Sequence, residues 1–384
     1  MKLPIYLDNS ATTPLDPRVL ERMLPFLAEH FGNPASTTHA FGNVALRAVE
    51  QARADVAKLL NCEEREIVWT SGATESNNLA LKGCAAACRS RGRHLVTLQT
   101  EHKAVLDTMK ELERQGCEVT YLAPQANGLV DPDAFERALR PDTILASVML
   151  VNNEIGVIQD IEALGALCAS RGVLLHVDAA QATGKVPIDV ERMPVDFMSL
   201  TAHKTYGPKG IGALYVRRER RNSLQAQMHG GGHERGLRSG TLATHQIVGM
   251  GECFRIAGEE MAEEVPRIRA LRDRLWAGLR DIPELRVNGD LEKRIANNLS
   301  LSVAVDNCDA LVNSLTDIAV SSTSACSSGS AMPSHVLQAI GAEGASAIRI
   351  TVGRFNSEAE IDHAIRHLRD KLEQCRAGRM QAIA

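Results

Sequence analysis

The chain has 384 residues, of which 44% are hydrophobic and 23% charged, and its net charge is -4. A chain of this length and composition can bury a sizeable core, so we expect a soluble globular protein with one large and one smaller domain. The mildly acidic balance argues against a nucleic-acid partner, and no apolar run is long enough to span a bilayer.

Short β-rich runs alternate with helical patterns over residues 66–216, which is typical of an α/β domain. The runs 144–150 and 173–177 are almost continuously apolar, as expected for strands that helices cover on both faces. A mostly parallel central sheet is therefore predicted. Residues 246–281 then predict a long helix or a bent pair, interrupted near Pro266, that connects to a second unit.

The second unit is predicted to be a smaller α+β domain. Its expected elements are strands at 298–305 and 347–352, a helix from Asp309 and a Ser-rich segment at 321–330. Ser357 and Glu360 form a capping box at the start of a closing helix. We assign residues 15–255 to the large domain, and residues 1–14 and 256–384 to the small one.

Two polar clusters follow predicted strands at one edge of the sheet. The strand 67–70 runs into residues 71–75 and then a helix, so free backbone N–H groups and hydroxyls gather at a helix N-terminus, which favours a phosphate. The second cluster, residues 201–204, follows the strand 196–200. Either cluster alone is compatible with an ordinary helix cap. Both lie at the carboxyl ends of strands, however, where open α/β sheets bind ligands.

Lys204, in the second cluster, has two interpretations: a plain surface lysine, or an amine that forms a Schiff base with an aldehyde cofactor in a dry pocket. The second interpretation requires a carboxylate partner. Asp178 ends the apolar run 173–177 and could keep a pyridine nitrogen protonated, with a helix cap as the alternative. His102 lies between a strand and a helix, where it is either a cap or a flat ring that stacks on the cofactor and shuttles a proton.

Cys326 is the most informative of the nine cysteines, because the polar segment 321–330 offers nothing to bury a thiol. Exposed thiols are a liability unless they are used, so we predict a mobile nucleophile, with an incidental surface cysteine as the alternative. The cysteines show no paired or metal-binding spacing, and the N-terminus lacks a secretion signal. We therefore expect a cytoplasmic protein without a metal site.

Arg349 and a glycine-rich run have open interpretations. The planar guanidinium of Arg349 suits a carboxylate ligand, and a structural salt bridge is an equally good account. Residues 229–236 are too flexible for the interior of a helix or strand, which leaves a phosphate loop or an interface loop.

The chain resembles the cysteine desulfurases of the NifS and IscS type in the class V aminotransferase family, and is most similar to the IscS branch. The resemblance runs from about Tyr6 to past Arg354, through YLDNSATTP, FGNPAS, TSGATESNNLA, TEHKAVLDT, VNNEIGV, HVDAAQATGKVPID, AHKTYGPKGIGALYVRR, MHGGGHERGLRSGTL and SSTSACSSGS. It implies the fold-type I architecture of pyridoxal 5'-phosphate (PLP) enzymes, with a large mostly parallel-sheet domain and a smaller α+β C-terminal domain. It also implies a homodimer whose subunits share each active site.

The resemblance assigns roles to individual residues. The catalytic residues would be Cys326, Lys204 and His102. The cofactor-binding residues would be Ala73, Thr74, Asn153, Asp178, Gln181, Thr201, His203, Lys204 and Thr241 of the partner subunit. Among these, Asp178 would contact the pyridinium nitrogen and Gln181 the ring hydroxyl. Asn153 and Arg349 would hold the substrate carboxylate.

The implied reaction removes sulfur from L-cysteine, giving L-alanine and a persulfide on Cys326 that passes to acceptor proteins for iron–sulfur cluster assembly or other thiolation. The acceptor stays open, because residues 331–333 read Ala-Met-Pro where many relatives have Leu-Glu-Pro. The chain also ends soon after Cys375, where housekeeping relatives carry a further tail that helps to dock the scaffold protein. The alternatives are a sulfur donor for tRNA thiolation or DNA phosphorothioation, a selenocysteine lyase, an aminotransferase, and a non-enzymatic scaffold.

Overall fold

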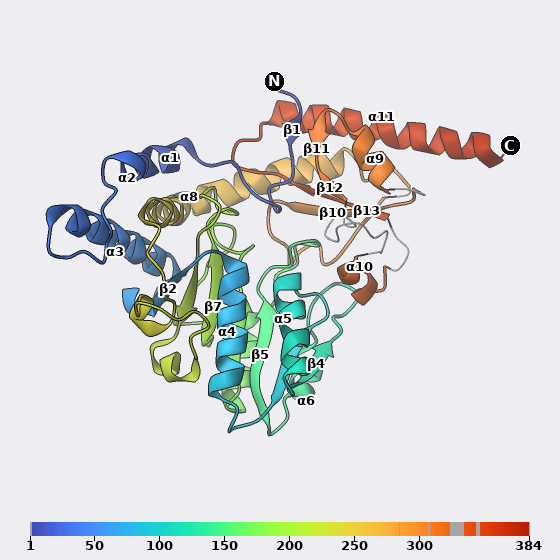
Figure 1. Ribbon diagram of the computed structural model, residues 1–384. Helices are drawn as coiled ribbons and strands as arrows, with labels where there is room; N and C mark the ends of the chain where they lie inside the picture. The colour runs from blue at the N-terminus through green and yellow to red at the C-terminus, as the bar shows by residue number, and fades with distance from the viewer. Residues whose placement is uncertain (1, 284, 306–307, 323–333, 343–345, 384) are drawn as a thin grey trace.

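The computed structural model describes residues 2–283, 285–305, 308–322, 334–342 and 346–383 (Figure 1). Within these residues, seven strands form the central sheet. In spatial order they are β2 (Ile67–Thr70), β8 (Gly212–Val216), β7 (Phe197–Thr201), β6 (Leu174–Asp178), β5 (Thr143–Met149), β3 (His94–Leu98) and β4 (Glu118–Leu122). Only β8 runs against its neighbours β2 and β7, so the expected mostly parallel sheet is confirmed.

Helices cover both faces of this sheet, which explains the unbroken apolar runs in its strands. The helices of the large domain before α8 are α1 (Pro17–Met23), α2 (Pro25–Ala28), α3 (Ala40–Leu60), α4 (Ala73–Ala87), α5 (Lys103–Arg114), α6 (Pro132–Ala138) and α7 (Ile161–Ser170), with short 3-10 turns at Glu64–Glu66, Arg218–Ser223 and Glu234–Gly236. In β6, Leu174 packs with the cluster under α4 and α5, while its neighbour Leu175 packs with the cluster on the opposite face. Figure 1 shows α4 and α5 lying in front of the sheet.

A smaller domain is built on a second sheet, as expected. Its strands, all antiparallel to their neighbours, are β12 (Ser321–Ser322), β13 (Ser346–Thr351), β10 (Asn298–Val303) and β9 (Arg286–Val287). Its helices are α9 (Cys308–Ser314), α10 (His335–Ala339) and α11 (Glu358–Ile383). The capping box of α11 is present, since Ser357 N–H donates to the Glu360 carboxylate and Glu360 N–H donates to Ser357 Oγ.

Two connections join the domains. Helix α8 (Thr244–Ala277) is continuous through Pro266 and is neither broken nor split into a pair, which corrects the expected interruption. The N-terminal strand β1 (Ile5–Tyr6) pairs in parallel with β11 (Ile318–Ala319), so the start of the chain packs against the small domain. The boundary that we drew at residue 255 falls inside α8 and stays a prediction.

No helix in the described ranges is long and apolar enough to cross a membrane. The same ranges contain no group of three or more His, Cys, Asp or Glu side chains that could hold a metal ion.

We predict that His176 makes the fold sensitive to acid. The side chain is fully buried in β6, its ring nitrogens lie 2.8 Å from Ser147 Oγ and 2.9 Å from Ser199 Oγ, and burial lowers its pKa from 6.5 to about 4. Between these two pH values the unfolded chain binds more protons at this position than the folded chain. His176 therefore contributes stability above pH 6.5 that is lost as the pH falls towards 4.

The measurement is urea unfolding of the wild type and of His176→Asn at several pH values. The wild type should lose roughly 3 kcal/mol more than the variant between pH 7 and 4. Parallel pH curves for the two proteins would contradict the prediction.

Candidate active site

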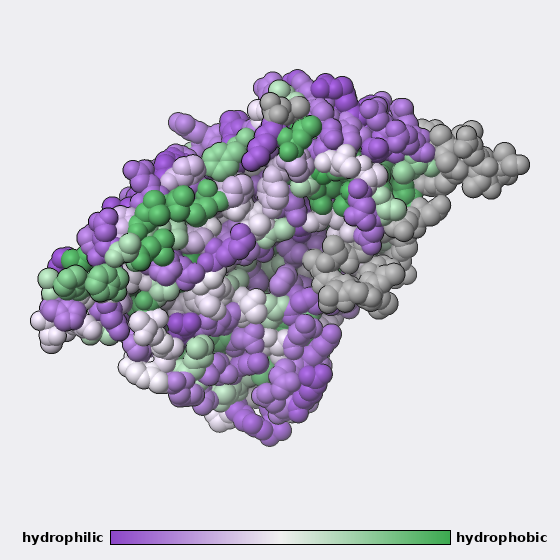
Figure 2. All heavy atoms as spheres, turned by 45° about the horizontal axis from the view of Figure 1, so that its top comes forward, coloured by the Kyte–Doolittle hydropathy of each residue, from purple (hydrophilic) through white to green (hydrophobic). Residues whose placement is uncertain are grey.

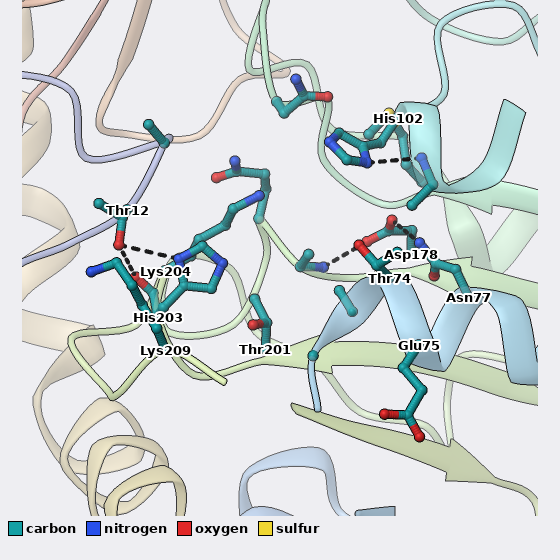
Figure 3. A pocket seen from close by; sticks show the side chains of 18 of the residues that line it. Thr12, Thr74, Glu75, Asn77, His102, Asp178, Thr201, His203, Lys204 and Lys209 are labelled. Atoms are coloured by element: carbon teal, nitrogen blue, oxygen red, sulfur yellow. Dashed lines mark hydrogen bonds between the residues drawn. The ribbon is translucent and has the colours of Figure 1, made fainter. Parts of the chain in front are cut away.

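A cavity of about 510 Å³ opens where β6 and β7 end and α4 begins (Figure 3). Nine residues that the sequence singled out line it together: Ala73, Thr74, His102, Asn153, Asp178, Gln181, Thr201, His203 and Lys204. The edge of the sheet where the sequence predicted ligand binding therefore contains a cavity.

One end of the cavity is suited to an anion. Helix α4 begins at Ala73, and Gly72 before it provides no side-chain cap, so the first N–H groups of the helix have no partner within it. A Cβ on Gly72 would meet nothing within 4 Å, and its φ of +154° favours glycine. The Glu75 carboxylate beside this end accepts a hydrogen bond from Ser71 N–H and forms an ion pair with Arg238 at 2.8 Å. Its charge is therefore compensated.

Asp178, at the end of β6, places a buried carboxylate in the cavity wall. Its side chain is 4% exposed, and it accepts hydrogen bonds from Asn77 Nδ2 at 2.8 Å and from Ala180 N–H at 2.9 Å (Figure 3). Both donors are neutral groups. A buried carboxylate favours a positive partner, so this wall suits a cationic ring nitrogen.

His102 is both a helix cap and a cavity residue. Its Nδ1 accepts a hydrogen bond from Ala104 N–H at 3.1 Å at the start of α5, which leaves the proton of the neutral ring on Nε2. Burial lowers the pKa of His102; the Asp178 charge opposes this shift, and the Lys204 charge adds to it. The imidazole is therefore neutral near pH 7. The two interpretations that the sequence left open are compatible.

Lys204 lies in a tight turn after β7. The carbonyl of Ala202 accepts hydrogen bonds from the N–H groups of Thr205 at 2.9 Å and Gly207 at 3.0 Å. Tyr206 leaves this turn with a φ of +60°, and its N–H donates to Thr13 Oγ1 at 2.8 Å. The turn therefore holds the backbone on either side of Lys204, which a surface lysine does not need.

The neighbouring His203 is also uncharged near neutral pH, because burial lowers its pKa to about 4 and the nearby Lys204 acts in the same direction. Its Nδ1 lies 3.1 Å from Thr12 Oγ1 (Figure 3). Gln181 faces the same cavity, and its Nε2 donates to the Ser10 carbonyl at 2.8 Å.

Arg349 contacts Asn153, which lines the cavity. Its Nη1 donates to the Asn153 carbonyl at 2.9 Å, and its Nη2 forms an ion pair with Asp8 at 2.8 Å. The salt bridge that the sequence offered as an alternative is therefore present. The buried Nε has no partner among the described residues, so one donor is available for a carboxylate.

Among the described residues, two predicted site residues, Arg349 and Thr241, do not line this cavity in the single chain. Thr241 is exposed and does not line it. Cys326 lies outside the described residues, and its role stays a prediction. After that gap, His335 at the start of α10 places Nε2 2.9 Å from the carbonyl of Glu101, the residue before His102.

Sequence reasoning missed three residues near the cavity: Asn77, Lys185 and Lys209. Asn77 could have been found, because it follows Thr74 by three positions on α4 and so lies on the same helix face. Lys209 lines the cavity, and Lys185 contacts Gln181. Neither lysine has a local pattern that distinguishes it from a surface residue.

Comparison with known proteins agrees with this geometry. The sequence model of class V aminotransferases matches residues 5–364. The chain belongs to the class V aminotransferase family. It is 64% identical over 379 residues to a protein named cysteine desulfurase IscS from Methylococcus capsulatus, covering 98% of this chain and 94% of the relative. A relative of the same name from Methylobacillus flagellatus is 64% identical over 380 residues, with the same coverage.

Solved structures show the same relationship. A NifS-like protein superposes with a TM-score of 0.89 at 39% identity, covering 97% of this chain and 99% of that one. SspA in complex with cysteine superposes with a TM-score of 0.82 at 39% identity, covering 92% of this chain and 100% of that one. This member of the class V family is therefore a PLP-dependent enzyme.

The residues that line the cavity of this class V enzyme fit PLP. The unpaired N–H groups at the start of α4 suit the phosphate, and Asp178 suits the pyridine nitrogen. The neutral ring of His102 and the amine of Lys204 line the same space.

Proposed function

We propose that this enzyme is a cysteine desulfurase, which takes sulfur from L-cysteine, releases L-alanine and holds the sulfur as a persulfide on Cys326. The observation that carries this proposal is the near full-length similarity, at 57–64% identity, to relatives named cysteine desulfurase IscS. The bound cysteine in the SspA structure agrees with this substrate. The IscS relatives favour iron–sulfur cluster assembly over tRNA thiolation, DNA phosphorothioation or selenocysteine cleavage as the purpose.

The described residues divide the work of binding. PLP, when bound, supplies an electron sink for the bonds at the α-carbon of an attached amino acid. The N–H groups at the start of α4, with Thr201 and His203 opposite, would hold the phosphate. Asp178 would hold the ring nitrogen in its charged form. Arg349, through its unpaired Nε, and Asn153 would orient the substrate carboxylate.

Proton movement is assigned to Lys204 and His102. Lys204 would attach the cofactor and, once released by the substrate, its amine would take the α-proton. His102 is neutral because burial lowers its pKa, so its Nε2–H can donate to the substrate and later recover a proton. Burial also raises the pKa of the adjacent Glu101 carboxyl, which disfavours a negative charge beside the ring.

Sulfur transfer is assigned to Cys326. Its thiolate would attack the substrate sulfur, so that an S–S bond forms while the C–S bond of the substrate breaks. The carbon framework keeps the electron pair of the broken bond, takes up protons and leaves as alanine. The persulfide then passes to an acceptor protein in the cytoplasm.

We also propose a homodimer in which Thr241 of the partner subunit completes the phosphate site. Exposed apolar side chains support it: Phe31 is 69% exposed and Phe41 57%, and their rings lie 5.5 Å apart. Figure 2 shows apolar side chains gathered at the end of the molecule that α2 and the start of α3 occupy. A patch of this kind is typical of an interface.

The solution mass tests the homodimer. We expect twice the 41.6 kDa of one chain by light scattering, and a lower mass for a Phe31→Asp, Phe41→Asp double variant, because each charge would be buried without a partner. A wild type at the mass of one chain would contradict the proposal.

Replacement of Cys326 tests the function. With cysteine and a thiol reductant, Cys326→Ala should form sulfide and alanine at least about a hundredfold more slowly than the wild type, because the sulfur acceptor is missing. Its cofactor absorbance should be unchanged. The control is Cys375→Ala in α11, which should keep full activity. Full activity of Cys326→Ala would refute the assigned nucleophile.

A further inference from the structure

Lys185 is a lysine beside the active site to which the proposed reaction gives no task. It lies in the loop after β6, and its Nζ donates to Gln181 Oε1 at 3.1 Å. Burial lowers its pKa from 10.5 to about 7, and the positive charges of Lys204 and Arg349 act in the same direction. Placing an ammonium group here costs free energy that a lysine at the surface would not lose.

Lys185 also lies directly behind the cofactor lysine. Both Lys185 and Lys204 line a second, small cavity of about 20 Å³, together with Thr205 and Asn297. This volume holds about one water molecule, and Lys185 itself is half-buried.

The partners of Gln181 determine which way its amide points. Its Nε2 lies 2.8 Å from the Ser10 carbonyl, which can only accept a hydrogen bond, and its Oε1 accepts a hydrogen bond from Lys185 Nζ at 3.1 Å. The reversed amide would place oxygen against oxygen on one side and N–H against N–H on the other. Both contacts therefore select the same orientation.

This orientation decides what Gln181 offers to a ligand. The amide nitrogen carries two protons, and Ser10 uses one of them. Because Gln181 lines the main cavity, the second N–H is available there, whereas the reversed amide would present a carbonyl oxygen. An N–H stabilises an oxygen anion on a bound ring, and a carbonyl would repel it.

We propose that Lys185 is a positioning residue, which fixes the Gln181 amide so that an N–H faces the oxygen substituent of the PLP ring. This inference rests on the proposed function, because it requires PLP in the main cavity. A merely structural lysine would stabilise the loop after β6 without changing how the cofactor is held.

The test measures how fast the holoenzyme releases PLP, followed by transfer of PLP to an excess of a competing apoenzyme. Lys185→Met removes the donor, and release should become roughly five- to tenfold faster, which corresponds to the loss of one typical hydrogen bond. Lys185→Gln keeps an N–H donor and should stay within about twofold of the wild type. Lys110→Met on the exposed face of α5 is the control and should not change release.

A double-mutant cycle tests whether Lys185 acts through Gln181. In a Gln181→Ala background, Lys185→Met should change release by less than about twofold, because the amide that it positions is gone. Equal acceleration in both backgrounds would show a general charge effect and overturn the proposal, as would unchanged release by Lys185→Met in the wild-type background.

Gln181→Glu keeps the proposal falsifiable should Lys185→Met fail to fold. A carboxylate at position 181 can accept from Lys185 but presents only oxygen to the ring, so release should be faster than from Gln181→Ala. Release at the wild-type rate would overturn the assigned orientation. A wild-type protein that holds no PLP at all would instead refute the proposed function, so the two failures are distinguishable.

Discussion

The burial of the Asp178 carboxylate is the constraint on which the site depends. It ends a fully buried strand, and its two hydrogen-bond donors, Asn77 and Ala180, are neutral. A carboxylate in such a place is stable as an anion only where a positive group faces it. A positively charged ring nitrogen in the cavity would be such a group. Ala73 at the start of α4 and Lys204 after β7 line the same cavity as Asp178.

The N-terminal segment, residues 8–13, joins the two domains at the cavity. Asp8 forms an ion pair with Arg349 of the small domain, whereas Ser10 accepts from Gln181 of the large domain. Thr13 donates to the His203 carbonyl and accepts from Tyr206 N–H on either side of Lys204. One short segment therefore links Arg349 to the turn that carries Lys204. A movement of one domain against the other would therefore displace Arg349 relative to the turn that carries Lys204.

Much of the fold was predictable because its signals are local. The apolar run 173–177 indicated a strand covered on both faces, and the residues that follow the strand ends marked the cavity. The sequence was wrong about Pro266, because packing of α8 against both domains outweighs the single backbone hydrogen bond that proline removes. The contact of Asn77 with Asp178 joins residues 101 positions apart, and no local pattern reports it. No local pattern distinguished Lys185 from an ordinary loop lysine either, because its cavity position arises only from tertiary contacts.

Three lysines, Lys185, Lys204 and Lys209, lie at or beside the cavity, and we propose that Lys204 forms the cofactor linkage. The direct measurement is borohydride reduction of the holoenzyme, which makes a lysine–cofactor linkage permanent, followed by peptide mapping with mass spectrometry. We expect a single modified residue, Lys204, and no modification in Lys204→Ala. Modification of Lys185 or Lys209 in the wild type, or of no lysine in a protein that contains PLP, would contradict it.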